Sequence, residues 1–214
     1  MALANYGQLK TAISAELARA SDSDFAASVP DFVDMFEVNV QRDLLHRRQQ
    51  TNTTLAVAAS GTSVTGFPSD FLSAEAVVLQ SSPLRTLASK TIFDLFNEYP
   101  NTTNARPEAY AIQNSGMLIR PPSDAAYNIE LYYYQGLTVL ASGSDSSTNW
   151  LLTNYPDLYL YGSLVHSAPF LEDDARLQVW VGLYDRAVGA LKGESARAIY
   201  SGSPIKSQID VAIV

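Results

Sequence analysis

The sequence predicts an α+β fold, with a helical bundle formed by both ends of the chain and a mostly antiparallel β subdomain inserted between them. Apolar residues recur every three or four positions near both ends. Short runs rich in β-branched and aromatic residues, separated by Gly, Pro and Asn, fill the middle. The predicted parts are N-terminal bundle helices in 1–48, the β-rich insertion in 49–140, C-terminal bundle helices in 141–200 and an extended tail in 201–214.

Two helices are expected before residue 48. Leu9, Ile13 and Leu17 follow one another at intervals of four, which places them on one face of a first helix. A polar run at residues 21–24 ends this helix, and Pro30 suits the first turn of a second helix that runs to about residue 46. The apolar stripe of the second helix comprises Val29, Phe32, Val33, Phe36, Val40 and Leu44.

The insertion is predicted to begin with a β-hairpin over residues 51–71, with turns at Ser60-Gly61 and near Gly66 and Pro68. Strands are then expected at 74–80 and 83–87, followed by a short helix that Ser89 would cap. A second hairpin turns at Asn114-Ser115-Gly116. One further strand of about eight residues lies within 125–137.

Residues 141–148 have the composition of a flexible linker, and helices are expected after it. One helix carries Leu158, Tyr161, Val165 and Ala168 on its apolar face, and Pro169 should break the chain behind it. The last helix runs from Glu172 onward and has its own apolar stripe, which predicts that Trp180 is a core residue. That stripe comprises Leu177, Trp180, Val181, Tyr184, Val188 and Leu191.

The composition argues against several classes of function. A net charge of -8 and a pI of about 4.6 disfavour binding to nucleic acid, because phosphates are held by Lys and Arg. No Cys is present, and the chain holds none of the common nucleotide-binding, zinc-protease or serine-hydrolase motifs. The start lacks the pattern of a signal peptide and no long apolar run occurs, so we expect a soluble protein that stays in the cell making it.

Few side chains are candidates for catalysis, and no cofactor or metal site is expected. The only histidines are His46 and His166, each expected on a helix, and His166 is interpreted as a packed or helix-end residue. Glu172, Asp173 and Asp174, or Glu98 near Tyr99, could supply the paired carboxylates of a glycoside hydrolase. The alternative function is therefore a peptidoglycan hydrolase using paired carboxylates, although an acidic run also suits the start of a helix.

Three groups of residues are candidates for contacts with a partner chain. Arg42, Arg47 and Arg48 lie at the end of the second helix, where they either stabilise the helix dipole or form a docking patch for an acidic partner. Tyr155 and Tyr159 fall off the predicted apolar stripe, so we expect them to meet a neighbouring subunit. The tail residues alternate in strand fashion and are apolar, which favours pairing with another chain. They are Ile205, Ile209, Val211 and Ile213.

The order of several long motifs resembles the head-to-tail adaptor proteins of tailed bacteriophages. The motifs are VPDFVDMFEVNVQRDLL, FPSDFL, RPEAYAI, MLIRPPSDAAYNIELYYYQ and NWLLTNYPDLYLYGSLVHSAPFLEDDARLQVWVGLYDRAV, and they extend over nearly the whole chain. The Ser-rich linker 141–148 and the tail after Ile199 are not matched by this pattern.

The resemblance implies a structural virion protein without enzymatic activity. Such adaptors form a connector ring, usually a dodecamer, that binds the portal protein and a downstream tail protein of the nozzle or tube. The ring extends the DNA ejection channel, through which genomic DNA passes without sequence-specific binding. The resemblance therefore places the protein at the head-tail interface of the virion, made in the host bacterial cytoplasm and in contact with no membrane.

Overall fold

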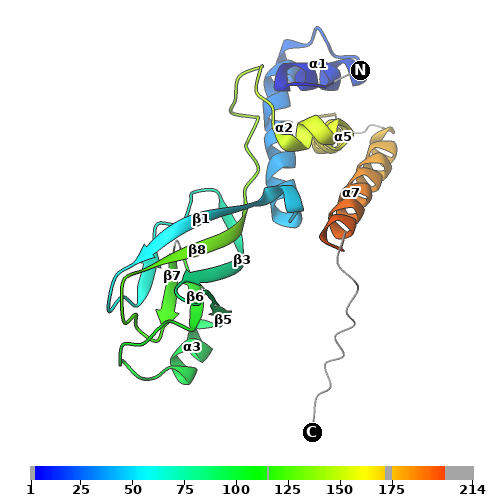
Figure 1. Cartoon of the computed structure of the whole chain (residues 1–214). Helices are drawn as coiled ribbons and strands as arrows, with labels where there is room; N and C mark the ends of the chain where they lie inside the picture. Colours follow the sequence, from blue (N-terminus) through cyan, green and yellow to red (C-terminus); the bar gives the residue numbers. More distant parts are fainter. Residues whose placement is uncertain (1–2, 115, 172–174, 201–214) are drawn as a thin grey trace. The chain divides into compact units, whose positions relative to one another are not determined.

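The computed structural model describes residues 3–114, 116–171 and 175–200 and shows two compact units (Figure 1). A helical unit is formed by the chain up to Arg48 together with the chain from Leu137 onward, and a β unit is formed by Gln49–Gly136. The predicted α+β fold is confirmed. The predicted tail, residues 201–214, lies outside the described residues.

The helical unit contains the helices from both ends of the chain. They are α1 (Tyr6–Glu16), α2 (Ser23–Asp43), α4 (Trp150–Asn154), α5 (Pro156–His166), α6 (Ala168–Leu171) and α7 (Leu177–Tyr200). Asn5, Asp22 and Asn149 cap α1, α2 and α4 by accepting hydrogen bonds from backbone N–H groups. Among the described residues, no helix combines the length and the hydropathy needed to cross a bilayer.

Helix α2 begins seven residues before Pro30, so the predicted start is wrong. The Asp22 carboxylate accepts hydrogen bonds from the backbone N–H groups of Asp24 and Phe25, which fixes the first turn at Ser23. Phe25 and Val29 are buried on the same side as the later apolar residues. Pro30 therefore lies inside the helix, and burial of Phe25 compensates for the unfavourable proline.

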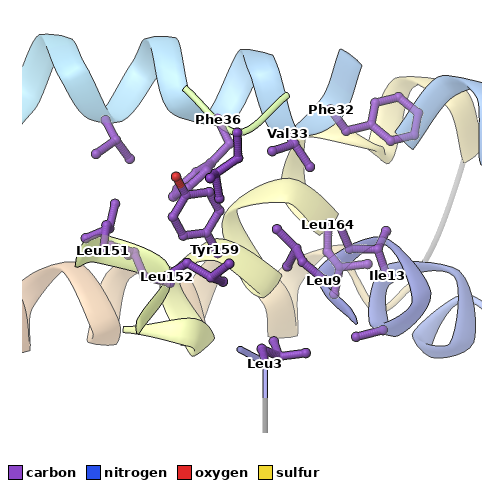
Figure 2. Close-up of a cluster of buried hydrophobic side chains, with 14 of the residues drawn as sticks. Leu3, Leu9, Ile13, Phe32, Val33, Phe36, Leu151, Leu152, Tyr159 and Leu164 are labelled. Carbon is purple, nitrogen blue, oxygen red and sulfur yellow. The ribbon is translucent and has the colours of Figure 1, made fainter. Parts of the chain in front are cut away.

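The core of the helical unit lies where α1, α2, α4, α5 and α7 meet (Figure 2). Leu9 and Ile13 of α1 contribute to it, together with the α2 stripe and Trp180 of α7, which is 2% exposed. The predicted core position of Trp180 is thus confirmed.

The predicted flexible linker 141–148 is held against α1. The Gly7 N–H donates to the Asp145 carbonyl over 2.8 Å, and Lys10 Nζ lies 2.7 Å from an Asp145 carboxylate oxygen. The Tyr6 N–H donates to the Ser147 carbonyl over 2.9 Å. The segment predicted to be a flexible linker thus bonds through its backbone and the Asp145 side chain to the first half of α1.

The β unit consists of two four-stranded sheets that share one core, with a short helix, α3 (Ile92–Glu98), beside the second sheet. The first sheet has the order β1 (Gln50–Val57), β8 (Tyr127–Gln135), β3 (Phe71–Gln80), β4 (Arg85–Thr86). The second has the order β2 (Ser63–Thr65), β7 (Gly116–Arg120), β6 (Ala109–Gln113), β5 (Ala88–Ser89). All pairs are antiparallel except β5 with β6.

The hairpin predicted over 51–71 does not form. Strand β1 pairs with β8, with Leu55 opposite Ile129, and β2 pairs with β7 in the other sheet. The hairpin of β6 and β7 is confirmed, with Gln113 opposite Gly116, although Ser115 of its turn lies outside the described residues. Helix α3 is capped by Thr91 rather than Ser89, because Ser89 belongs to β5.

Candidate functional site

The three predicted basic residues are exposed at the end of α2 and in the short 3-10 helix η1 (Arg47–Gln49) that follows it. Arg42 lies in the last turn of α2, and Arg47 and Arg48 lie in η1. All three side chains face solvent, so a partner chain can reach them.

His46 fixes the turn that leads into η1. It is 2% exposed and its ring stacks on Trp150, with centroids 5.2 Å apart and an interplanar angle of 20°. Its Nδ1 accepts a hydrogen bond from the Arg48 N–H over 3.1 Å, and burial lowers the pKa of the imidazole. His46 lies beyond the end of α2, so its predicted position on a helix is wrong. Its contacts orient the backbone of the basic residues.

Tyr155 links the junction of α4 and α5 to α7. Its hydroxyl donates to the Glu194 carboxylate, and its ring meets the edge of Trp150 at 90° with centroids 6.4 Å apart. Burial and the Glu194 carboxylate raise the pKa of Tyr155 to about 12. The side chain is half-buried, so part of its ring remains accessible to another chain.

Tyr159 is fully buried, and its predicted role in a partner interface is wrong. Its ring meets Phe36 edge to face with centroids 4.8 Å apart (Figure 2). Its hydroxyl donates to the Glu37 carboxylate over 2.8 Å and accepts from the Asn149 side-chain amide over 2.6 Å. The buried face of α5 includes Leu158, Tyr159 and Gly162. Tyr161, which was predicted to lie on the apolar face, is half-buried.

Gly162 permits the close approach of α5 to α2. A Cβ built there would lie 2.2 Å from Phe36 Cδ2. We expect Gly162→Ala to lower the free energy of unfolding by about 1–3 kcal/mol, because the rigid Phe36 ring would have to move. Gly182 of α7 is the matched control, since nothing lies within 4 Å of its added Cβ. Urea denaturation of both variants checks this, and a Gly162→Ala variant as stable as Gly182→Ala would contradict it.

Glu37 is a buried carboxylate that sequence reasoning missed. It is 1% exposed, and it accepts hydrogen bonds from the Leu140 N–H over 2.8 Å and the Ala141 N–H over 3.3 Å as well as from Tyr159. Burial raises the pKa of Glu37. The signal was present in the sequence, because Glu37 lies four residues after Val33 and three before Val40, within the apolar stripe of α2.

The remaining ionisable candidates form no reactive cluster in the part of the chain that the structure describes. His166 is the last residue of α5, and its Nε2 lies 2.9 Å from Asn39 Nδ2. This position agrees with its interpretation as a packed or helix-end residue. Glu98 is bonded to Lys90 over 2.9 Å, whereas Glu172, Asp173 and Asp174 lie outside the described residues. Among those described, no group of three or more His, Asp or Glu could hold a metal ion.

The described candidate residues of the helical unit thus combine an exposed basic group with exposed apolar residues. Met35 and Val38 of α2, Leu45 just beyond the end of α2, and Val179 of α7 are each more than one-third exposed. The four tail candidates all lie outside the described residues. They are Ile205, Ile209, Val211 and Ile213.

Comparison with known proteins gave one family. The model of a family described as SU10 adaptor protein matches residues 4–207, which include both units. No curated protein matches the chain.

Proposed function

Since the chain belongs to the family of SU10 adaptor proteins, we propose that it forms a ring, of twelve copies, between the portal and the tail of a tailed phage. The ring would extend the DNA channel at the head-tail junction of the virion. The match over residues 4–207 is the observation that carries this proposal, because it takes in the helical unit and the β unit together. The role is structural, without catalysis.

The charge of the chain is suited to a DNA channel. At -8 per subunit, twelve copies would give the ring a strongly negative field. DNA phosphates are not retained by such a surface, since retention requires Lys and Arg that displace counterions. Genomic DNA would then pass without sequence-specific binding.

We place the contacts with neighbouring chains on the helical unit and the tail. Arg42, Arg47 and Arg48 are exposed and would dock on an acidic surface of the portal or of the next subunit. The accessible part of Tyr155 would contribute a ring edge at the same junction. The tail residues would lie extended against the portal or a neighbouring subunit, since apolar residues at a terminus are protected when another chain covers them.

The test is the mass of the purified protein with and without purified portal protein, by mass photometry and electron microscopy. We expect a complex whose added mass equals twelve subunits of 23.3 kDa, arranged as a ring on the portal. A different copy number would correct the stoichiometry, and no association with the portal would overturn the proposed position of the protein.

Two variants of the same experiment locate the contacts. Deleting residues 203–214 should abolish or strongly reduce attachment to the portal, and undiminished attachment would remove the tail from the interface. Arg42→Glu with Arg48→Glu should weaken attachment at least about tenfold, because charges at an interface set association rates and register. Arg186→Glu with Lys192→Glu, at two exposed residues of α7, is the matched double charge reversal and should have little effect.

The hydrolase alternative gains no support from the fold. Its acidic residues, Glu172, Asp173 and Asp174, lie outside the described residues. The other candidate, Glu98, is paired with Lys90 over 2.9 Å in the β unit.

A further inference from the structure

Helix α2 has a second stripe of residues on the side that faces away from the core. Its members are exposed and recur at intervals of four, three and four, the spacing of a coiled-coil seam. They are Asp31, Met35, Val38 and Arg42. At 3.6 residues per turn they fall within about 60° of arc, opposite the buried stripe. We call these four residues the outer stripe of α2.

The outer stripe has an acidic end, an apolar centre and a basic end. Met35 and Val38 at its centre are 56% and 41% exposed. None of the salt bridges among the described residues involves Asp31 or Arg42. Asp34, which is also exposed, lies about 70° to one side of the stripe. The two charges of the stripe are therefore available to opposite charges of another chain.

The outer stripe is complementary to itself when two copies of α2 lie antiparallel. The midpoint between Met35 and Val38 is also the midpoint between Asp31 and Arg42. A two-fold axis through this point would bring Met35 of one copy level with Val38 of the other. The same axis would bring Asp31 level with Arg42 of the other copy, about 8 Å along the helix on either side. Each apolar contact and each ion pair would form twice.

A parallel arrangement of the same two helices lacks this complementarity. In register it brings Asp31 against Asp31 and Arg42 against Arg42, and like charges at an interface are unfavourable. A slide of about 16 Å would bring Asp31 of one copy level with Arg42 of the other, but only once, and it would separate Met35 from Val38. The stripe therefore favours the antiparallel orientation.

An unrelated acidic partner fits the stripe less well than a second copy. Such a partner would attract Arg42 but repel Asp31 and Asp34. A basic partner would attract the two carboxylates but repel Arg42. A second copy supplies both signs at the spacing that the stripe requires, together with apolar residues at the centre.

We propose that free copies of the chain pair through the outer stripes of α2, antiparallel about a two-fold axis between Met35 and Val38. One short helix pair buries less surface than the roughly 800 Å² per partner of a standard interface, so the dimer is weak, with a dissociation constant of about 10–100 µM. It is also weakened by salt, because its ion pairs are exposed.

The dimer has a consequence for assembly. It covers Arg42 on both copies, and Arg42 is one of the residues through which the ring is proposed to dock. A subunit therefore leaves the dimer before this residue can contact another chain. This consequence rests on the proposed function, whereas the dimer itself does not, because it forms in the absence of the portal.

Charge reversal tests the pairing in the purified full chain without portal protein. Sedimentation equilibrium is measured over concentrations that span the expected dissociation constant, at low and at high salt. Arg42→Glu alone and Asp31→Arg alone should each raise the dissociation constant about tenfold, because each turns both ion pairs into like-charge pairs. Asp31→Arg with Arg42→Glu should dimerise nearly as well as the parent, since both ion pairs form again with reversed sign. Arg186→Glu, at an exposed residue of α7, is the control and should have little effect.

Thiol crosslinking gives an independent measurement, because the chain has no Cys of its own. Met35→Cys chains are mixed with Val38→Cys chains and treated with a short bismaleimide. We expect a crosslink between residues 35 and 38 of different copies, identified by mass spectrometry, in a yield several-fold above that of the control mixture. The control replaces Val38→Cys by Val179→Cys, since Val179 is 60% exposed on α7.

Several outcomes would overturn the proposal. A parent chain that stays monomeric at every concentration would exclude the dimer, and a first associated species larger than a dimer would exclude two-fold pairing. Single reversals that associate like the parent, or a double reversal no better than the single ones, would exclude the pairing of Asp31 with Arg42. A crosslinking yield equal to that of the control would exclude the contact of Met35 with Val38. None of these results bears on attachment to the portal.

Discussion

Trp180→Ala is expected to lower the free energy of unfolding by about 3–5 kcal/mol, the cost of removing a large aromatic side chain from a core. Trp180 is 2% exposed in the cluster formed by α1, α2, α5 and α7. The Arg176 guanidinium lies 5.2 Å from the centre of its ring, and Arg176 also donates to the Glu16 carbonyl of α1 over 2.9 Å. Loss of the indole thus removes apolar burial and the cation-π contact together.

Urea denaturation followed by circular dichroism measures this effect. Val179→Ala is the control, because Val179 is the preceding residue on α7 and is 60% exposed. Its substitution should change stability by no more than about 0.5 kcal/mol. Similar losses for the two variants would contradict a core role for Trp180.

Helix α7 shows what local periodicity can predict. Its apolar residues repeat along one side of the helix, because the other side faces solvent, and Trp180 and Leu191 were therefore correctly assigned to the core. The start of α2 was harder, since Pro30 resembles a first-turn proline. The Asp22 cap and Phe25, eight and five residues before Pro30, determine the actual start.

Helix α5 shows where periodicity fails. It packs against α1, α2, α4, α6 and α7, so apolar residues occur on nearly every side of it. A stripe cannot be assigned reliably to a helix that is enclosed in this way. Tyr159 was consequently placed at an interface although it is a core residue. Gly162 was the better signal, because a glycine inside a helix often marks a close helix contact.

The pairing of strands that are distant in the sequence could not be predicted from the local pattern, unlike the hairpin of β6 and β7. The strands other than β5 were recognised from their own composition, but β1 and β8 are separated by about 70 residues and their register depends on the shared core of the two sheets. The candidate site residues also fall into two groups, those whose position could be predicted from the sequence and those whose position could not. Exposure of Arg42, Arg47 and Arg48 followed from their charge, whereas the buried network of Glu37, Tyr159 and Asn149 required the tertiary structure.

Glu37→Leu is expected to lower the free energy of unfolding by roughly 3–5 kcal/mol, because it leaves three buried donors without their acceptor at about 1–3 kcal/mol each, less the desolvation cost of the carboxylate. The donors are the N–H groups of Leu140 and Ala141 and the Tyr159 hydroxyl. Adding Tyr159→Phe removes one of these donors. The double variant should therefore lose less stability than the sum of the two single variants.

The contribution of Glu37 to the stability of the fold changes with pH in a direction that follows from its raised pKa. Burial raises the pKa of Glu37 in the folded protein above its ordinary value, so the folded state holds this proton more tightly than the unfolded state does. The resulting stabilisation is fully present below the unfolded pKa of Glu37. It is lost as the pH rises through the raised folded pKa.

Glu37→Gln isolates this contribution, because glutamine keeps the shape of the side chain but does not titrate. We expect the stability of the parent relative to Glu37→Gln to increase as the pH falls from 7 toward 4.5, the ordinary pKa of a glutamate side chain. Asp31→Asn removes an exposed carboxylate six residues before Glu37 on the same helix and should leave the pH profile nearly unchanged. Urea denaturation at several pH values gives the difference directly. A difference that stays constant or decreases with falling pH would show that the folded chain does not favour the protonated Glu37, and that its hydrogen bonds from Leu140, Ala141 and Tyr159 outweigh its burial.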